Sequence, residues 1–253
     1  MKSIIALAAL VALCCGSPRA EDSAPKPQHK VLVELFTSQG CNSCPPAEKV
    51  LTQLGVHAQF GAKIVPLAWH VDYWDYIGWP DKFASPAHTQ RQKDYARILK
   101  LRGLVTPQFI VANKPTQQLG QAIQTDAAKA AVLGIEVSAT LKDGKIAAPV
   151  KLSKVDAAYT LDPGAVVRVV LFQAQASTKC MAGENAGKTL EESYLVLKAH
   201  EPLPAADALD KGVSASFDAP SGQAPGNLGV AVLVEVPGSM TTLECAAVPL
   251  KQE

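Results

Sequence analysis

The sequence has no run of basic or acidic residues, no repeat of fixed period and only one long apolar run, at its N-terminus. Its formal net charge is +1, so the charge pattern favours neither nucleic acid nor an anionic lipid surface as a partner. After the first residues, no stretch is long and apolar enough for a transmembrane helix. Hydrophobic residues make up 48% of the chain and charged residues 19%, which favours a packed core over disorder.

Residues 1–20 are typical of a secretory signal peptide. One lysine precedes an apolar run from Ile4 to Cys15, which is too short to span a bilayer. The alternative is that this run forms a buried N-terminal helix. Residues 21–30 are polar and contain proline, which indicates a linker. We therefore expect the mature protein to be exported, to the periplasm or beyond the cell, without a transmembrane segment.

The remaining sequence divides into two parts with different predicted secondary structure. In residues 31–134, predicted strands (31–37, 63–71, 107–114) alternate with predicted helices (47–54, 89–101, 125–133). This alternation predicts an α/β layer structure with some parallel strand pairing. Residues 135–253 contain mainly β runs, with a hairpin signal at Asp143-Gly144 and a predicted long surface loop over 201–227. The predicted fold is therefore an α/β domain followed by a mainly antiparallel β domain, α+β overall.

The cysteine pair Cys41 and Cys44 lies between the first predicted strand and the first predicted helix. A zinc site is disfavoured because no second Cys-x-x-Cys follows. A purely structural disulfide is disfavoured because so small a loop gives little stabilisation. A redox role fits better: a helix N-terminus favours the Cys41 thiolate, and Cys44 lies close enough to resolve a mixed disulfide.

Two further positions support a redox role. Thr106-Pro107 stands directly before a predicted strand, where a cis proline would present the Thr106 backbone to a substrate. An ordinary trans proline at a strand start is the alternative. Glu34 lies among apolar residues, where a buried carboxylate could relay protons to the disulfide. The alternative is that Glu34 lies on an exposed strand face.

The segment HVDYWDYIGWPD, residues 70–81, follows a predicted strand at its carboxyl end, where α/β folds place ligands. One interpretation is a substrate-binding platform beside Cys41, formed by His70, Asp72, Tyr73, Trp74 and Asp75. A second is a copper site made by Cys41, Cys44 and His70, since thiolate and imidazole suit copper. A third is an aromatic plug that only closes the domain.

Two cysteines remain in the second half. Cys180 and Cys245 are expected to form a structural disulfide, because a bond that closes a long loop stabilises usefully. Free buried thiols are the alternative. The segment GENAG, residues 183–187, follows Cys180 and predicts a turn, with Glu184 and Asn185 as possible contacts to the aromatic segment.

These residues carry a resemblance. The order strand, Cys-x-x-Cys-Pro, helix, strand, helix, Thr-Pro-strand resembles the thioredoxin fold. The resemblance implies Cys41 as nucleophile, Cys44 as resolving thiol and Pro107 as a cis proline facing the pair. It places Glu34 near the buried acid of thioredoxins. Gly40 stands where that family usually has an aromatic residue.

A longer resemblance covers nearly the whole mature chain. The segments ELFTSQGCNSCPPAE, AWHVDYWDYIGWPDKFASP, RQKDYA, LRGLVTPQ and GENAGKTL are similar to an exported bacterial family, domain of unknown function 1223. That family is thioredoxin-like with an added β domain. The expected function is thus a thiol–disulfide oxidoreductase that acts on protein thiols or disulfides, with no cofactor besides its own disulfide. A periplasmic copper-binding protein and a non-catalytic interaction module are the alternatives.

Overall fold

The structure is a computed structural model that describes residues 27–56 and 63–252. The predicted signal peptide and the first six residues of the predicted linker lie outside this range. The helices are α1 (Pro45–Val56), α2 (Pro86–Ile98), α3 (Leu119–Ala127), α4 (Ala205–Asp210) and the 3-10 turns η1 (Asp75–Ile77) and η2 (Pro225–Asn227). The strands are β1 (Val31–Thr37), β2 (Ile64–His70), β3 (Gln108–Val111), β4 (Lys114–Thr116), β5 (Leu133–Val137), β6 (Thr140–Lys142), β7 (Lys145–Lys154), β8 (Val166–Lys179), β9 (Thr189–Ala199), β10 (Leu203–Pro204), β11 (Val213–Asp218), β12 (Leu228–Val236), β13 (Thr241–Pro249) and β14 (Lys251–Gln252).

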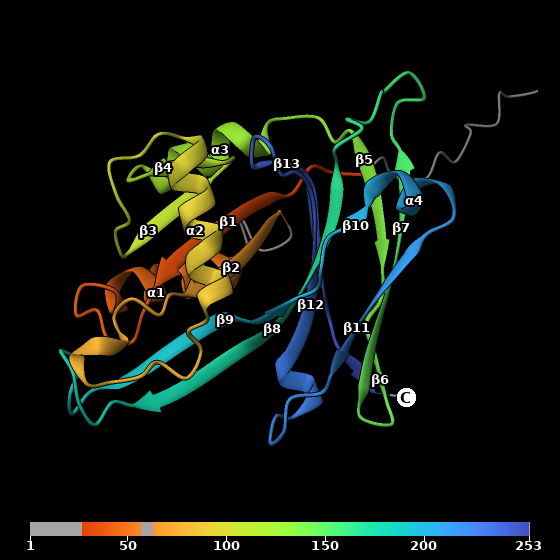
Figure 1. The fold of residues 1–253 in the computed structure, drawn as a ribbon. Coiled ribbons are helices and arrows are strands. Elements are labelled where there is room, and N and C mark those ends of the chain that lie inside the picture. The colour runs from red at the N-terminus through yellow and green to blue at the C-terminus, as the bar shows by residue number, and fades with distance from the viewer. Residues whose placement is uncertain (1–26, 57–62, 253) are drawn as a thin grey trace, which may run out of the picture.

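The strands form two sheets (Figure 1). The larger has nine strands, in the order β13-β12-β8-β9-β2-β1-β3-β4, with β10 paired to β8. The smaller has five, in the order β11-β7-β6-β14, with β5 paired to β7. In the larger sheet β1 pairs with β2 in parallel, and β9 joins β2 in parallel at Ala68 and Leu195. Strands from both halves of the sequence therefore share one sheet.

The predicted fold class is wrong. The protein is mostly β, with two mixed sheets and few helices, rather than an α/β thioredoxin-like domain followed by a β domain. The long strands β8 and β9 from the second half extend the sheet that begins with β1 and β2. Alternating elements in the first half predicted parallel pairing correctly, but local patterns do not specify which strands of the second half join that sheet.

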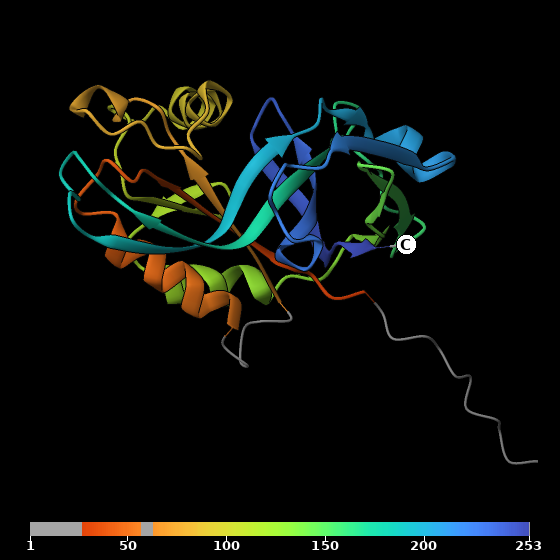
Figure 2. The same ribbon diagram turned by 90° about the horizontal axis from the view of Figure 1, so that it is seen from below.

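Helices cover both faces of the sheet around β1 and β2, with α1 and α3 on one side and α2 on the other (Figure 2). Val33 and Leu35 of β1 pack toward α1 and α3, whereas Leu32 and Phe36 pack with Tyr95 of α2. Both faces being covered explains why β1 is buried at every position and reads as an almost continuous apolar run. A third core fills the space between the two sheets.

Several local predictions hold and several do not. The hairpin at Asp143-Gly144 joins β6 to β7, and both turn residues have positive φ, as a type I′ turn requires. The helix predicted over 125–133 is misplaced: α3 ends at Ala127, and Thr125 is not its N-cap but donates back to the Gln121 carbonyl. The predicted loop over 201–227 contains β10, α4, β11 and η2.

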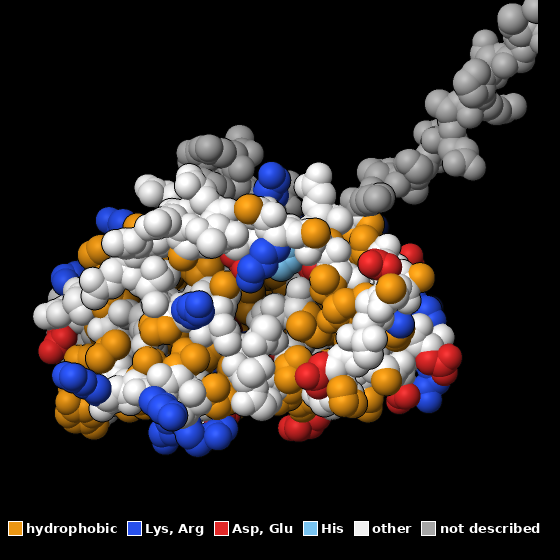
Figure 3. All heavy atoms as spheres, turned by 90° about the horizontal axis from the view of Figure 1, so that it is seen from above, with side chains coloured by type: hydrophobic (Ala, Val, Ile, Leu, Met, Phe, Trp, Pro, Cys, Tyr) orange, Lys and Arg blue, Asp and Glu red, His pale blue; other side chains and the backbone are white. Residues whose placement is uncertain are grey.

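The face of the molecule seen in Figure 3 carries separate basic and acidic side chains with hydrophobic side chains between them. Among the described residues, none of the helices has the length and apolar character needed to cross a membrane.

Candidate functional site

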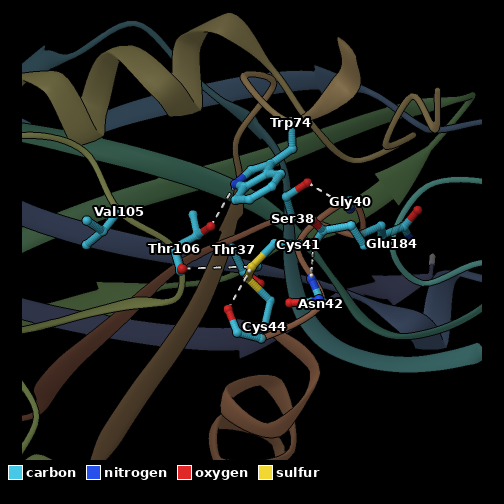
Figure 4. The surroundings of a disulfide bond; sticks show 12 residues. Thr37, Ser38, Gly40, Cys41, Asn42, Cys44, Trp74, Val105, Thr106 and Glu184 are labelled. Carbon is cyan, nitrogen blue, oxygen red and sulfur yellow. Dashed lines mark hydrogen bonds between the residues drawn. A yellow bond between two sulfur atoms is a disulfide. The ribbon is translucent and has the colours of Figure 1, made fainter. Parts of the chain in front are cut away.

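Cys41 and Cys44 form a disulfide in the loop that joins β1 to α1 (Figure 4). Their Cα atoms are 5.5 Å apart. Cys44 directly precedes α1, and its carbonyl accepts hydrogen bonds from the N–H groups of Ala47 and Glu48. Pro45 and Pro46, the first two residues of α1, have no N–H group. The start of α1 therefore offers fewer free donors to a thiolate than an ordinary helix N-terminus does.

The loop before β3 lies against the disulfide. Its Thr106–Pro107 peptide bond is cis, and the Thr106 carbonyl oxygen lies 3.8 Å from the Cys41 sulfur. The Ser43 hydroxyl lies 3.3 Å from the same sulfur. The Ser43 hydroxyl is thus in reach to donate a hydrogen bond to Cys41, as a thiolate would require.

The turn between β8 and β9, which contains the segment GENAG, caps the disulfide loop from the second half of the chain. The Asn185 side chain is fully buried and donates hydrogen bonds to the carbonyls of Gln39 and Cys41, at 2.9 and 3.0 Å. The Glu184 carboxylate accepts a hydrogen bond from the Asn42 backbone N–H. Sequence reasoning assigned this segment a turn and missed its contact with the disulfide.

Trp74 covers the disulfide from the aromatic segment. Its indole N–H donates to the Thr106 hydroxyl at 2.8 Å, so the ring and the proline loop are joined beside Cys41 (Figure 4). Cys41 is consequently only 1% exposed and Cys44 is fully buried. A partner can reach the disulfide only after part of this cover moves.

The other residues predicted to bind substrate lie within the aromatic segment's own hydrogen-bond network. Asp72 accepts a hydrogen bond from the Thr89 hydroxyl, and the Tyr73 hydroxyl donates to Gln92. Asp75 accepts from the Asp81 backbone N–H. These contacts fix the segment against α2 and against its own turn. Trp74 and Thr106 are the two members of the predicted set that lie beside the disulfide in Figure 4.

Glu34 is fully buried, but its partners lie on the α2 side of the sheet. Its carboxylate accepts hydrogen bonds from the Arg91 guanidinium, at 2.6 Å, and from the Tyr95 hydroxyl. Arg91 also pairs with Glu235, which Arg168 contacts as well. The predicted proton relay from Glu34 to the disulfide therefore lacks a direct contact, because Glu34 belongs to a buried ion-pair cluster.

A second group of buried acids, which sequence reasoning missed, lies behind the disulfide loop. Glu48 of α1 accepts a hydrogen bond from the Thr37 hydroxyl at 2.6 Å. His70 at the end of β2 holds Asp81 with its Nδ1, at 2.6 Å, and its Nε2 lies 3.9 Å from Glu192 of β9. One signal was available: Glu48 follows Cys44 by four residues, so both lie on one face of the helix start. Nothing in the sequence linked Asp81 or Glu192 to them.

Burial shifts the ionisation of this group. It raises the pKa of Glu192 to about 7 and raises the pKa of Glu48, despite the nearby His70. Burial opposes protonation of His70, but the carboxylates of Asp81, Glu192 and Glu48 outweigh it and raise the His70 pKa to about 9. The His70–Asp81 pair holds the pKa of Asp81 below its ordinary value.

The predicted structural disulfide between Cys180 and Cys245 is wrong, because both residues are free buried thiols. Cys245 of β13 and Arg168 of β8 both pair with Leu233 of β12. Cys180 lies twelve residues further along the chain from Arg168, just past the end of β8. At about 3.3 Å per residue, twelve residues of extended strand span up to roughly 40 Å, so the two cysteines lie far apart along the sheet.

The predicted copper ligands do not come together as one set. Among the described residues, the group of potential ligand atoms that lie within 4.8 Å of one another consists of Glu48, His70 and Glu192. The Cys41 and Cys44 sulfurs are not members of that group. His70 thus faces two carboxylates rather than the cysteine pair.

Comparisons with known proteins agree with this architecture. The solved structure of protein AGR_C_4864 from Agrobacterium tumefaciens is 24% identical, with a TM-score of 0.64 over 89% of this chain and 96% of that one. HBP35 of Porphyromonas gingivalis is 15% identical, with a TM-score of 0.65 over 88% of this chain and 76% of that one. At these identities the likeness shows a shared fold. Among curated proteins, no match is found.

A sequence model of one family covers most of the chain. The family is described as protein of unknown function (DUF1223), and its model matches residues 32–235. The match includes the disulfide loop, the aromatic segment, the Thr106–Pro107 loop and the turn that holds Asn185. This chain therefore belongs to the DUF1223 family.

Proposed function

We propose that this chain is an exported thiol–disulfide oxidoreductase that exchanges the Cys41–Cys44 disulfide with thiols or disulfides of protein partners. The observation that carries the proposal is the disulfide between two cysteines at a helix start, with the Thr106 carbonyl 3.8 Å and the Ser43 hydroxyl 3.3 Å from one sulfur. A loop of this size contributes little as a structural cross-link, which leaves exchange chemistry as its better use. Export rests on residues 1–20 and on the oxidising compartment that a disulfide requires.

The exchange follows from the positions of the two sulfurs. A thiolate of the partner attacks the Cys41 sulfur, the Cys41–Cys44 bond breaks, and Cys44 leaves as a thiolate that takes up a proton. A second partner thiol then attacks the partner sulfur joined to Cys41. The partner's disulfide forms and Cys41 leaves as the free thiol. Two electrons and two protons pass from the partner to this chain, and the reverse sequence reduces a partner disulfide.

The surroundings of the disulfide favour a polypeptide partner over a small thiol. Four large hydrophobic side chains are exposed in the described part of the chain. Three of them lie in segments that surround the disulfide. Tyr76 belongs to the aromatic segment, Val105 to the proline loop and Met181 to the loop after β8. An apolar partner segment that contacts these residues would also displace the cover formed by Trp74 and the Thr106–Pro107 loop.

The proposal includes a relation to the thioredoxin-like superfamily, limited to the unit formed by β1, the Cys-x-x-Cys loop, α1 and the Thr106–Pro107 loop. That arrangement supports Cys41 as the attacked sulfur, Cys44 as the resolving thiol and Pro107 as a partner-facing residue. It does not extend to the whole fold, where β8 and β9 complete the sheet.

The test is capture of partners by a resolving-thiol variant. We expect Cys44→Ser to accumulate mixed disulfides through Cys41 with exported proteins, because no second thiol releases them. Cys41→Ser and the double variant are the matched controls and should capture none. Cys245→Ser, which changes a buried thiol far from the site, should behave as the unmodified protein.

A second measurement gives the direction of exchange. In glutathione buffers, a reduction potential near about −120 mV indicates a disulfide donor and one near about −270 mV a reductant. A Cys44→Ser protein that captures no partner, together with a disulfide that never equilibrates with glutathione, contradicts the proposal.

A further inference from the structure

The buried group behind the disulfide contains two polar atoms without a hydrogen-bond partner among the described residues: Oε2 of Glu48 and Nε2 of His70. Glu48 is 3% exposed and His70 is fully buried. An unpaired buried donor or acceptor is costly to keep, so two such atoms side by side indicate a missing ligand. Glu192, 2% exposed, lies on the third side.

We propose that Glu48, His70 and Glu192 form a binding site for one divalent transition-metal cation of the zinc class. One ligand atom from each residue lies within 4.8 Å of the other two, and His70 Nε2 lies 3.9 Å from Glu192 Oε1. Two ligand atoms bound at about 2.1 Å lie at most about 4.2 Å apart, so these side chains need only small shifts to hold an ion. One imidazole and two carboxylates suit zinc or manganese.

Each of the three ligands is oriented by a neighbour, as is usual in metal sites. Asp81 accepts from Nδ1–H of His70, which leaves Nε2 as the ligand atom. The Thr37 hydroxyl holds one oxygen of Glu48 and leaves Oε2 free. The amide of Gln39 donates to both oxygens of Glu192, at 3.1 and 2.8 Å, and fixes that carboxylate.

The charge of the group also favours a cation. Three carboxylates surround one imidazole, and within the described ranges no lysine or arginine pairs with any of them. A dication balances two of the carboxylates while His70 is neutral. The third, on Asp81, keeps its hydrogen bond to His70. In water-excluded surroundings such a balance is worth far more than at the surface.

A second cluster of the same residue types shows the contrast. His29 contacts Asp126 with one ring nitrogen and Glu244 with the other, at 3.2 and 3.1 Å. Both nitrogens of His29 are therefore occupied, and no ligand atom is left for an ion. The two clusters thus contain the same residue types, and only the one whose histidine has a free ring nitrogen carries the proposal.

An ion at this site would join three elements. Glu48 comes from α1, His70 from the end of β2 and Glu192 from β9. Strands β2 and β9 pair at the single register position Ala68 and Leu195. The ion would therefore link β2 and β9 beside a strand pairing that has only one register position.

The test uses the full mature chain, oxidised at Cys41–Cys44 so that those thiols cannot bind metal. After treatment with a chelator, Zn²⁺ is added to the native protein and, separately, during refolding, and binding is measured against a chromophoric chelator. We expect one Zn²⁺ per chain. Glu192→Gln should weaken binding by at least about 100-fold, and Asp81→Asn by about 10- to 100-fold.

The matched controls are Glu191→Gln, an exposed neighbour of Glu192 on the same strand, and His29→Gln in the second cluster. Both should bind Zn²⁺ as the unmodified protein does. The midpoint of thermal unfolding of the unmodified protein should also rise with Zn²⁺ concentration. The proposal is overturned if the unmodified protein binds neither Zn²⁺ nor Mn²⁺ by either route. Equal binding by Glu192→Gln or by Asp81→Asn overturns it as well, so the second variant decides if the first does not fold.

Discussion

The turn that caps the disulfide loop makes a quantitative prediction. Asn185 donates two hydrogen bonds, at 2.9 and 3.0 Å, to carbonyls of the disulfide loop. Asn185→Ala removes both, and a typical hydrogen bond contributes about 0.5–1.5 kcal/mol net. The free energy needed to open the loop should fall by about 1–3 kcal/mol. If opening precedes reduction, the reduction rate rises by a factor of about 5 to 150, at about 1.4 kcal/mol for each factor of ten.

The assay is the rate at which dithiothreitol reduces the Cys41–Cys44 disulfide, followed by trapping the new thiols with a maleimide and counting them by mass. Asn227→Ala is the matched control, because Asn227 also exchanges two hydrogen bonds with a backbone, that of Gln175, outside the disulfide loop. It should lower global stability without speeding reduction. Equal rates for Asn185→Ala and the unmodified protein would refute the idea that this turn gates the disulfide.

Three further predictions concern stability. Arg91→Met removes the arginine that pairs with Glu34 and one of the two arginines that pair with Glu235. The free energy of unfolding measured in urea should fall by about 3–5 kcal/mol. Hydrogen bonds to two carboxylates raise the pKa of His29 to about 9. Protonated His29 therefore stabilises the fold, and its whole contribution is present below pH 6.5. That contribution, up to about 3 kcal/mol, should be lost as the pH rises from 6.5 to about 9. Gly229→Ala places a Cβ 2.4 Å from an aromatic ring of β8, and thermal unfolding should show a loss of about 1–3 kcal/mol.

Each of these has a control in the same chain. Arg97→Met removes an exposed pair with Asp94 on the same helix and should cost less than about 1 kcal/mol. His29→Gln should flatten the dependence of stability on pH between 6.5 and 9. Gly226→Ala adds a Cβ that meets nothing within 4 Å, and its unfolding midpoint should stay close to that of the unmodified protein.

The sequence predicted the disulfide loop because its signals are local. A continuous apolar strand, two cysteines, two prolines and a helix follow one another within residues 31–56, and each feature constrains its neighbours directly. The Asp143-Gly144 hairpin was predictable for the same reason, since its two turn residues adopt a conformation that few other pairs accept.

The rest depends on contacts between distant residues. Glu34 and Glu48 are acids in two consecutive predicted elements, and only the packing of α2 and β9 decides which of them lies behind the disulfide. Likewise, an even number of cysteines suggested that Cys180 and Cys245 pair, yet the strand register of β12 places them far apart. A pattern along the chain does not contain the order of strands across a sheet.

Strand β9 comes from the second half of the chain but completes the surroundings of the disulfide loop, which matters for recombination between homologues. Strand β9 lies beside β2, and the turn that leads into it carries Asn185. A chain cut after residue 134 would lose both and would expose the edge of β2, and exposed strand edges are templates for aggregation. Its disulfide loop would also lose the two hydrogen bonds from Asn185, although Trp74 and the Thr106–Pro107 loop would remain. A crossover between homologues at residue 134 would therefore join the disulfide loop of one protein to the capping turn of another, and a segment that keeps both reaches at least to β9.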